Sequence, residues 1–594
     1  VARVPLPADL PLGRHRVRVA LGAGGGARTA EQTLIVAPDR CPDPAAVLQG
    51  QRAFGLTANL YAVRSGRNWG AGDATDLREL VRFAAGAGAA FVGVNPLHAL
   101  RNAGDEISPY SPVSRLFRNV LYLDVDALPE LADAPEARRM LAAPAFRRAL
   151  ARLRAATHVD YAAVMRLKLP ALELLHAAFR RRTRGPRRRA YGRYVAAQGE
   201  ALARFATFLA IEETAGSAGG WRAWPEPLQS PESPAVAAHA RAHADRVDFH
   251  RWLQFALDEQ LAAAAAEARA RGLPVGLYQD LAIGTSPSSS DAWSFPGLFV
   301  EGASIGAPPD PLAPQGQNWG LPPLHPHRLA EQGYGYWGAL VRGALRHAGA
   351  LRIDHVIGLF RQFWIPAGMS GAAGAYVRVP TRDLLAVLAL ESTRAGALVV
   401  GEDLGTVPPE VPAVLERWGI LSSRVLYFER EGAGDFKPAR AYPRLALATA
   451  NTHDLPTLAG FRAATDVTIR RRLGLVDGAP AERAARRARA DEVAALVRRL
   501  ADEGIVDATG EPDDLALRAA VHTFLRRTPA WLVGLSLDDL VGEAEPVNVP
   551  GVPPADFPSW TRRLTTPLEA LAADPAVRRA LGAEREWAAG VLIR

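Results

Sequence analysis

Cysteine is almost missing from this chain: Cys41 is the only one among 594 residues. A single thiol excludes an intramolecular disulfide framework and any zinc site built on several thiolates. It fits the reducing environment of the cytoplasm, where we expect the protein to reside. No apolar run reaches transmembrane length, so we expect no membrane partner. Residues 1–10 hold neither a signal peptide nor an initiator methionine, which indicates a trimmed or incomplete N-terminus.

Phosphate-binding loops are missing as well. The glycines between Gly22 and Gly26 precede any predicted helix, and no glycine-rich loop joins a strand to a helix elsewhere. No group of potential metal ligands stands at a recognisable spacing. We therefore expect neither a metal nor an organic cofactor.

Lysine is rare, and the basic residues are almost all arginine, in a chain crowded with Ala, Gly and Pro. The formal charge of +8 is compatible with nucleic-acid binding. The arginine content is more typical of a coding bias, so we expect no nucleic-acid partner. The densest basic run, Arg180–Arg189, lies in a region of helical spacing, where a solvated face or a mobile loop is the favoured interpretation.

Buried strands and helices alternate along most of the chain. Short apolar runs indicate eight strands, near residues 56, 92, 277, 351, 399, 426, 447 and 532, and the sixth is placed at Arg424–Phe428. Helices separate most of them, which predicts an α/β fold, a (β/α)8 TIM barrel. Between the second and third strands, residues of about 98–270 show helical spacing, clearest over Asp160–Ala177 and Val247–Arg271. This region is expected to be a large helical insertion.

A small β-rich part precedes the barrel. Arg14–Ala20 and Glu31–Ala37 are predicted strands, with a glycine turn between them and a proline-rich linker at Pro38–Pro44. We expect residues 1–44 to be part of a β-sandwich-like domain and its linker. Residues 45–594 are then the catalytic barrel with its insertion.

Three predicted barrel strands end in acids. Asp354 follows the strand near 351, Glu402 the strand near 399, and Asp454 the strand near 447. Residues at the carboxyl ends of barrel strands face the open mouth. For one such motif alone, an ordinary salt bridge at a strand end is slightly favoured. Three of them together favour a carboxylate active site.

Carboxylates at a barrel mouth are typical of glycosyl chemistry. Arg352 lies two residues before Asp354 on the same strand face and should keep it ionised, as a nucleophile requires. Glu402 follows an apolar run and lies near other acids, and both raise a carboxyl pKa toward that of a general acid. Asp454, beside His453, is placed to bind sugar hydroxyls.

Several segments together resemble one enzyme family. They are RIDHVIGLFRQFWIP, VVGEDLGTVPPEV, NTHDLPTLAG, GLYQDLAIG and GAPPDPLAPQGQNWGLPP. From about residue 50 to the C-terminus the chain is similar to the 4-alpha-glucanotransferases (amylomaltases, disproportionating enzymes) of glycoside hydrolase family 77. The resemblance implies Asp354 as nucleophile, Glu402 as acid/base and Asp454 as transition-state stabiliser. It implies that Arg352 and His453 bind the donor sugar.

The resemblance also extends to substrate contacts. It implies Tyr110 as the stacking platform of the donor site, and it places Asp310, Gln317 and Trp319 on a loop over the acceptor side. Packing alternatives remain: Tyr110 as a loop aromatic and Trp319 as a buried anchor. Five further residues are left without a catalytic role: His355 as structural, Asp280 and Asp403 as supporting acids, and Asn548 and Trp560 as undecided.

The function that follows is transfer of alpha-1,4-glucan segments from a maltooligosaccharide donor to the 4-hydroxyl of an acceptor, with retention. Such an enzyme belongs to cytoplasmic glycogen and maltodextrin metabolism, with maltooligosaccharides and alpha-1,4-glucans as its partners. Two alternatives stand beside it. One is an alpha-amylase-like hydrolase using the same acids. The other is a carbohydrate- or nucleic-acid-binding protein with an inactive barrel, which the intact acid set disfavours.

Overall fold

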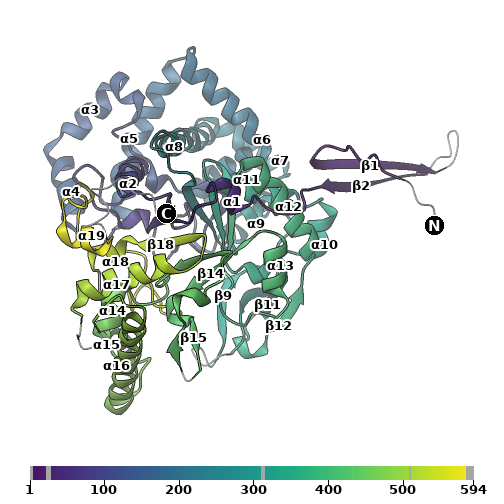
Figure 1. Cartoon of the computed structure of the whole chain (residues 1–594). Coiled ribbons are helices and arrows are strands. Elements are labelled where there is room, and N and C mark those ends of the chain that lie inside the picture. Colours follow the sequence, from purple (N-terminus) through teal and green to yellow (C-terminus); the bar gives the residue numbers. More distant parts are fainter. Residues whose placement is uncertain are drawn as a thin grey trace.

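The computed structural model describes residues 5–21, 28–309, 315–432, 434–507, 510 and 512–582. Its centre is a closed barrel of eight parallel strands, paired in chain order (Figure 1). The barrel strands are β3 (Ala53–Ala58), β4 (Phe91–Val94), β7 (Gly276–Leu281), β10 (Ala350–Ile353), β13 (Leu398–Gly401), β14 (Leu421–Val425), β17 (Ala446–Thr449) and β18 (Leu532–Ser536). The predicted TIM barrel is confirmed.

One predicted strand is misplaced. The expected strand Arg424–Phe428 lies at Leu421–Val425, and a 3-10 turn covers Leu426–Phe428. The second and third residues of the strand are serines, which break the apolar pattern of the sequence. Their polar groups are satisfied by Asp403, which accepts from the Ser422 hydroxyl and, at 2.8 Å, from the Ser423 N–H.

Helices follow most barrel strands and bury an apolar face against them. In the helix that follows β3, Asp73 accepts from the N–H of Asp76, and Asp76 in turn accepts from the N–H of Asp73, a capping box. The helices outside the insertion are α1 (Pro44–Val47), α2 (Ala74–Gly86), α9 (Ser290–Ser294), α10 (Pro326–Glu331), α11 (Gly335–Leu345), α12 (Thr381–Ala395), α13 (Val411–Arg417), α14 (Leu458–Ala463), α15 (Thr465–Arg472), α16 (Gly478–Asp502), α17 (Asp514–Arg527), α18 (Leu537–Val541) and α19 (Pro575–Ala580).

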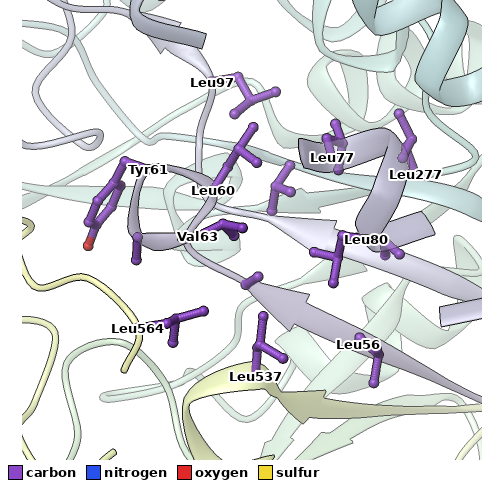
Figure 2. Packing of buried hydrophobic residues seen from close by; sticks show 14 of the residues in the cluster. Leu56, Leu60, Tyr61, Val63, Leu77, Leu80, Leu97, Leu277, Leu537 and Leu564 are labelled. Atoms are coloured by element: carbon purple, nitrogen blue, oxygen red, sulfur yellow. The ribbon is translucent and has the colours of Figure 1, made fainter. Parts of the chain in front are cut away.

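The core continues from the strands into these helices. Figure 2 shows leucines of β3, α2, β7 and the C-terminal segment meeting around Leu56 and Leu60, both fully buried. Each such side chain contributes about 1.5–3 kcal/mol relative to its exposed state. Inside the barrel, space is tight: a Cβ on Gly55 would lie 2.3 Å from the Phe91 ring.

The predicted helical insertion is confirmed between β4 and β7. It contains α3 (Pro135–Ala142), α4 (Pro144–Ala155), α5 (Tyr161–Arg181), α6 (Pro186–Ala215), α7 (Pro234–Ala242) and α8 (Ala244–Ala270), after a short ladder of β5 (His98–Ala99) and β6 (Ser114–Arg118). In Figure 1 most of these helices lie together above the barrel.

The long segment after β7, which reads as a loop in the sequence, contains regular structure. Two of its strands, β8 (Ala303–Ala307) and β9 (Gln317–Leu321), join β11 (Arg361–Pro366) and β12 (Ala375–Arg378) in the sheet order β12-β11-β8-β9. Glycine and proline conceal these strands from a pattern search. A smaller hairpin pairs β15 (Arg430–Glu431) with β16 (Asp435–Phe436).

The predicted N-terminal strands form an antiparallel hairpin of β1 (Gly13–Leu21) and β2 (Arg28–Val36), which projects from the barrel in Figure 1. The glycine turn lies outside the described residues. The hairpin base contacts the helices, with Arg394 Nη2 donating to the Leu12 carbonyl at 3.2 Å. No helix of the described residues is long and apolar enough to cross a membrane.

Candidate active site

The register of two neighbouring strands brings the first two acids together. Ile353, the last residue of β10, pairs with Gly401, the last residue of β13. Asp354 and Glu402 come next, so they leave adjacent parallel strands at the same level, where strands lie about 4.8 Å apart. The N–H of His355 donates to Glu402 Oε2 at 2.8 Å. The predicted pairing of these acids at the mouth therefore has a direct structural basis.

Arg352 links Asp354 to a further acid. Its Nη1 lies 3.0 Å from Asp354 Oδ1 and 2.9 Å from each carboxylate oxygen of Asp280 at the end of β7. Asp280 also accepts from the Tyr110 hydroxyl at 2.7 Å. The second oxygen of Asp354 accepts from the Ile283 N–H at 3.3 Å. These contacts fix the Asp354 carboxylate beside a permanent cation that it shares with Asp280.

Glu402 has the electrostatic environment of a general acid. Burial raises its pKa, Arg352 opposes this, and the neighbouring Asp354 carboxylate raises the pKa further, to about 7. The N–H groups of His355 and Leu404, each 2.8 Å from a carboxyl oxygen, favour the ionised form only in part. Glu402 is therefore half protonated near neutral pH.

Asp454 is the opposite case. Desolvation disfavours its charge, but His453 and the Asn548 amide outweigh this and lower its pKa to about 2. His453 Nε2 lies 3.3 Å from Asp454 Oδ2, and Asn548 Nδ2 donates to Oδ1 at 2.6 Å. Desolvation lowers the His453 pKa, and Asp454 more than restores it, for a net rise. Asp454 is a fixed negative charge at the mouth.

Aromatic rings cover one side of this cluster. Tyr110 stacks on His453 with ring centroids 4.6 Å apart, and Trp560 lies 5.5 Å from Tyr110 and 5.1 Å from His453. Tyr110, Arg352 and His453 were all predicted for the donor side, and the structure brings them together. Trp560, whose role the sequence left undecided, joins them.

Two of the three predicted acceptor-side residues, Gln317 and Trp319, lie on β9. Trp319 Nε1 donates to Gln317 Oε1 at 3.1 Å, and the Trp319 ring meets His355 edge-on at 5.3 Å. Trp319 is half-buried rather than a fully buried anchor. The contact with His355, the residue after Asp354, places Trp319 next to the acid cluster. Asp310 lies outside the described residues.

Two adjoining cavities open around the acids. One, of about 160 Å³, is lined by Glu402, Arg352, Tyr110 and His453 among others. The other, of about 50 Å³, is lined by Asp354 and His355. The cavities adjoin because Glu402 bonds the His355 backbone and Arg352 pairs with Asp354. Within the described residues, no group of three or more potential ligands is arranged to hold a metal ion.

Sequence reasoning left Asn548 without a role and missed two acids of the site, Asp538 and Asp539. Asn548 reaches Asp454 from 94 residues further along the chain. Asp538 and Asp539, just after β18, line the larger cavity. The rule that located the other acids, an apolar strand followed by carboxylates, applies to these two as well. No strand pattern marks Asn548, which only the family resemblance singled out.

Comparisons with known proteins agree with this geometry. A family model for the 4-alpha-glucanotransferases of glycoside hydrolase family 77 matches residues 58–569, and one for the MalQ N-terminal beta sandwich domain matches residues 1–38. A 4-alpha-glucanotransferase of Mycobacterium bovis is 42% identical over 584 residues, 95% of this chain and 77% of the relative. A 4-alpha-glucanotransferase of Haemophilus influenzae is 36% identical over 562 residues, which cover 92% of this chain and 80% of the relative.

A solved structure is similar over nearly the whole chain. The amylomaltase of Corynebacterium glutamicum superposes with a TM-score of 0.85 at 34% identity, covering 97% of this chain and 81% of that one. The match of residues 1–38 also agrees with the expected β-sandwich-like start.

Proposed function

Because this chain belongs to glycoside hydrolase family 77 and has the activity of a 4-alpha-glucanotransferase, we propose that Asp354, Glu402 and Asp454 are its catalytic acids. The observation that carries the assignment is the pairing of Asp354 with Glu402 on adjacent strand ends, one beside a guanidinium and the other with a pKa of about 7. These are the two states that a retaining mechanism needs, with carboxyl groups about 5–5.5 Å apart.

In the first step Asp354 attacks the anomeric carbon of the donor. A bond forms between its carboxylate oxygen and that carbon, while the glycosidic bond to the leaving glucan breaks. Glu402 gives its proton to the departing 4-oxygen. The proposed position of the anomeric carbon is between the two cavities, since Glu402 lines one of them and Asp354 the other.

In the second step Glu402 takes the proton of an acceptor 4-hydroxyl, whose oxygen attacks the anomeric carbon and releases Asp354. Two inversions give net retention. Between the steps, Asp454 and His453 bind hydroxyls of the distorted ring, and Arg352 keeps the nucleophile ionised. Tyr110 packs against the donor sugar.

Transfer to sugar rather than to water depends on the acceptor side. Gln317 and Trp319, with Asp310 on the same segment, are the proposed contacts of the incoming glucan. The contact of Trp319 with His355 supports this assignment, because His355 directly follows the proposed nucleophile Asp354. The proposed substrates are maltooligosaccharides and alpha-1,4-glucans.

Nucleic acid is not a proposed partner. In the densest basic run, Arg180 pairs with Asp245 at 2.7 Å, Arg187 pairs with Glu130, and Arg188 lies over the Phe179 ring at 4.9 Å. These cations contact groups of the insertion itself. We also propose the division into residues 1–44 and 45–594, with location in the cytoplasm.

Incubation with maltotriose tests the proposal. A transferase produces glucose together with a ladder of longer maltooligosaccharides, whereas a hydrolase produces glucose and maltose only. Asp354→Asn should remove both activities, and Trp319→Ala should lower the ratio of ladder to hydrolysis products. Products no longer than maltose would support the amylase-like alternative, and full activity in Asp354→Asn would refute the nucleophile.

A further inference from the structure

The segment that carries His453 and Asp454 is held at both of its ends by one side chain. This segment leaves β17 after Thr449 and enters α14 at Leu458. Near its start, Asn451 Nδ2 donates to Asp539 Oδ2 at 3.0 Å. At its end, the Leu458 N–H donates to Asp539 Oδ1 at 2.7 Å. The two oxygens of a single carboxylate thus bracket the catalytic segment.

Asp539 is well suited to this task because it is rigid. Its side chain is 1% exposed, and it lies in α18 directly after barrel strand β18. Arg518 Nη1 donates to the Asp539 main-chain carbonyl at 2.8 Å. The adjacent Asp538 turns to Arg562 instead. Asp539 lines the larger cavity, but both of its carboxylate oxygens are engaged by Asn451 and Leu458, so its effect on the reaction passes through the segment.

Asp454, by contrast, has little packing of its own. Its side chain is 46% exposed, and its position depends on His453, on Asn548 and on the path of the backbone. Loops with few buried contacts are displaced most easily. A shift of about 1 Å at a catalytic group can cost up to a hundredfold in rate.

We propose that Asp539 is a positioning residue, which fixes the geometry of Asp454 in the transition state by clamping both ends of the 451–458 segment. This inference rests on the proposed role of Asp454 as transition-state stabiliser. It assigns a function in the reaction to a carboxylate that does not contact the reacting atoms.

Asp539→Ala removes both acceptors and should lower kcat at least tenfold, with the donor KM changed less than twofold, because the lost interaction is one made in the transition state. In Asp539→Asn the remaining side-chain oxygen can still accept from the Leu458 N–H. The Asn451 amide can rotate so that its oxygen accepts from the amide NH2 introduced at position 539. This variant should therefore recover most of the lost kcat. Asn451→Ala releases one end only and should cost less than Asp539→Ala.

The matched control is Glu391→Ala. Glu391 is 2% exposed in α12 and pairs with Arg342 at 2.7 Å, away from both cavities. It should lose thermal stability while keeping its kcat per folded molecule. If Asp539→Ala folds poorly, Asn451→Ala on the half-buried rim provides the same readout.

A double-mutant cycle with Asp454→Asn separates the clamp from a general loss of structure. If Asp539 acts through Asp454, then Asp539→Ala should cost less than twofold further in that background. A kcat within twofold of wild type in Asp539→Ala, or a loss that simply multiplies with that of Asp454→Asn, would overturn the clamp. Full activity of Asp454→Asn itself would instead reject the proposed catalytic acids and is thus a distinguishable outcome.

Discussion

The fraction of Glu402 that is protonated determines how kcat/KM should depend on pH. Its ordinary pKa of 4.5 is raised to about 7 by burial and by Asp354. At the ordinary value, about 0.3% of the carboxyl groups would be protonated at pH 7, whereas about half are protonated here, a gain of roughly 150-fold. Protonated Glu402 is the form that can act as acid. We therefore expect kcat/KM to fall above neutral pH, with a midpoint near 7.

The assay is the initial rate of product formation from maltotriose at low substrate concentration between pH 4 and 9. A second donor, an alpha-maltosyl fluoride, needs little protonation of its leaving group. With the fluoride, the fall of the glycosylation rate above neutral pH (the basic limb of the pH profile) should largely disappear. Glu402→Gln should show the same flat pH profile with this donor. These comparisons assign the limb to the leaving-group proton.

Another buried acid of the mouth requires a control, because the pKa of Asp539 is also raised to about 7, chiefly by burial. If Glu402 is responsible, Asp539→Asn should keep most of the rate and leave the midpoint unchanged. A midpoint at or below about 5 in the wild type, or a limb that persists with the fluoride in Glu402→Gln, would refute the assignment of Glu402 as general acid.

Three further outcomes follow from the site. Glu402→Gln should raise Tm more at pH 8 than at pH 5 in scanning calorimetry, because ionising a carboxyl with a raised pKa costs up to about 3 kcal/mol as pH rises through 7. Gly371→Ala should raise the KM for the acceptor, measured with glucose and a fixed donor, since the added Cβ would lie 2.8 Å from the Gly316 Cα beside the acceptor-side strand. Asn548→Ala should lower kcat about tenfold with a small change in donor KM, because the 2.6 Å bond to Asp454 is lost, and steady-state kinetics on maltotriose would reveal an unchanged kcat.

Much of the barrel was predictable because its strands are buried on both faces. Continuous apolar runs such as Leu398–Gly401 are visible without knowledge of their partners. The strand at Leu421–Val425 was misplaced because its serines are buried by virtue of bonds to Asp403, which comes from another part of the chain. The strands of the smaller sheet were missed for a related reason: glycines hide them, and one of these, Gly306, sits where a Cβ would meet a neighbouring carbonyl at 2.0 Å.

The candidate site likewise contains residues that strand patterns predict and residues that only long-range contacts bring in. Asp354 and Glu402 follow apolar strands, so their convergence was an inference from fold geometry. The bond from Asn548 to Asp454, and the two bonds that Asp539 makes to the 451–458 segment, join residues that no periodicity connects. Such contacts depend on loop paths, which the sequence pattern does not specify.

This division has a consequence for how the site tolerates change. The pairing of Ile353 with Gly401 sets the level of Asp354 and Glu402, and a slip of one residue in either strand would turn the acid of that strand to the other face. Their geometry is therefore inseparable from the stability of the barrel. Asp454 stands on a loop and depends on side-chain bonds that contribute about 0.5–1.5 kcal/mol each. Substitutions around Asp454 should thus adjust transition-state binding while the barrel stays folded, whereas substitutions at the strand ends of β10 and β13 should change rate and stability together.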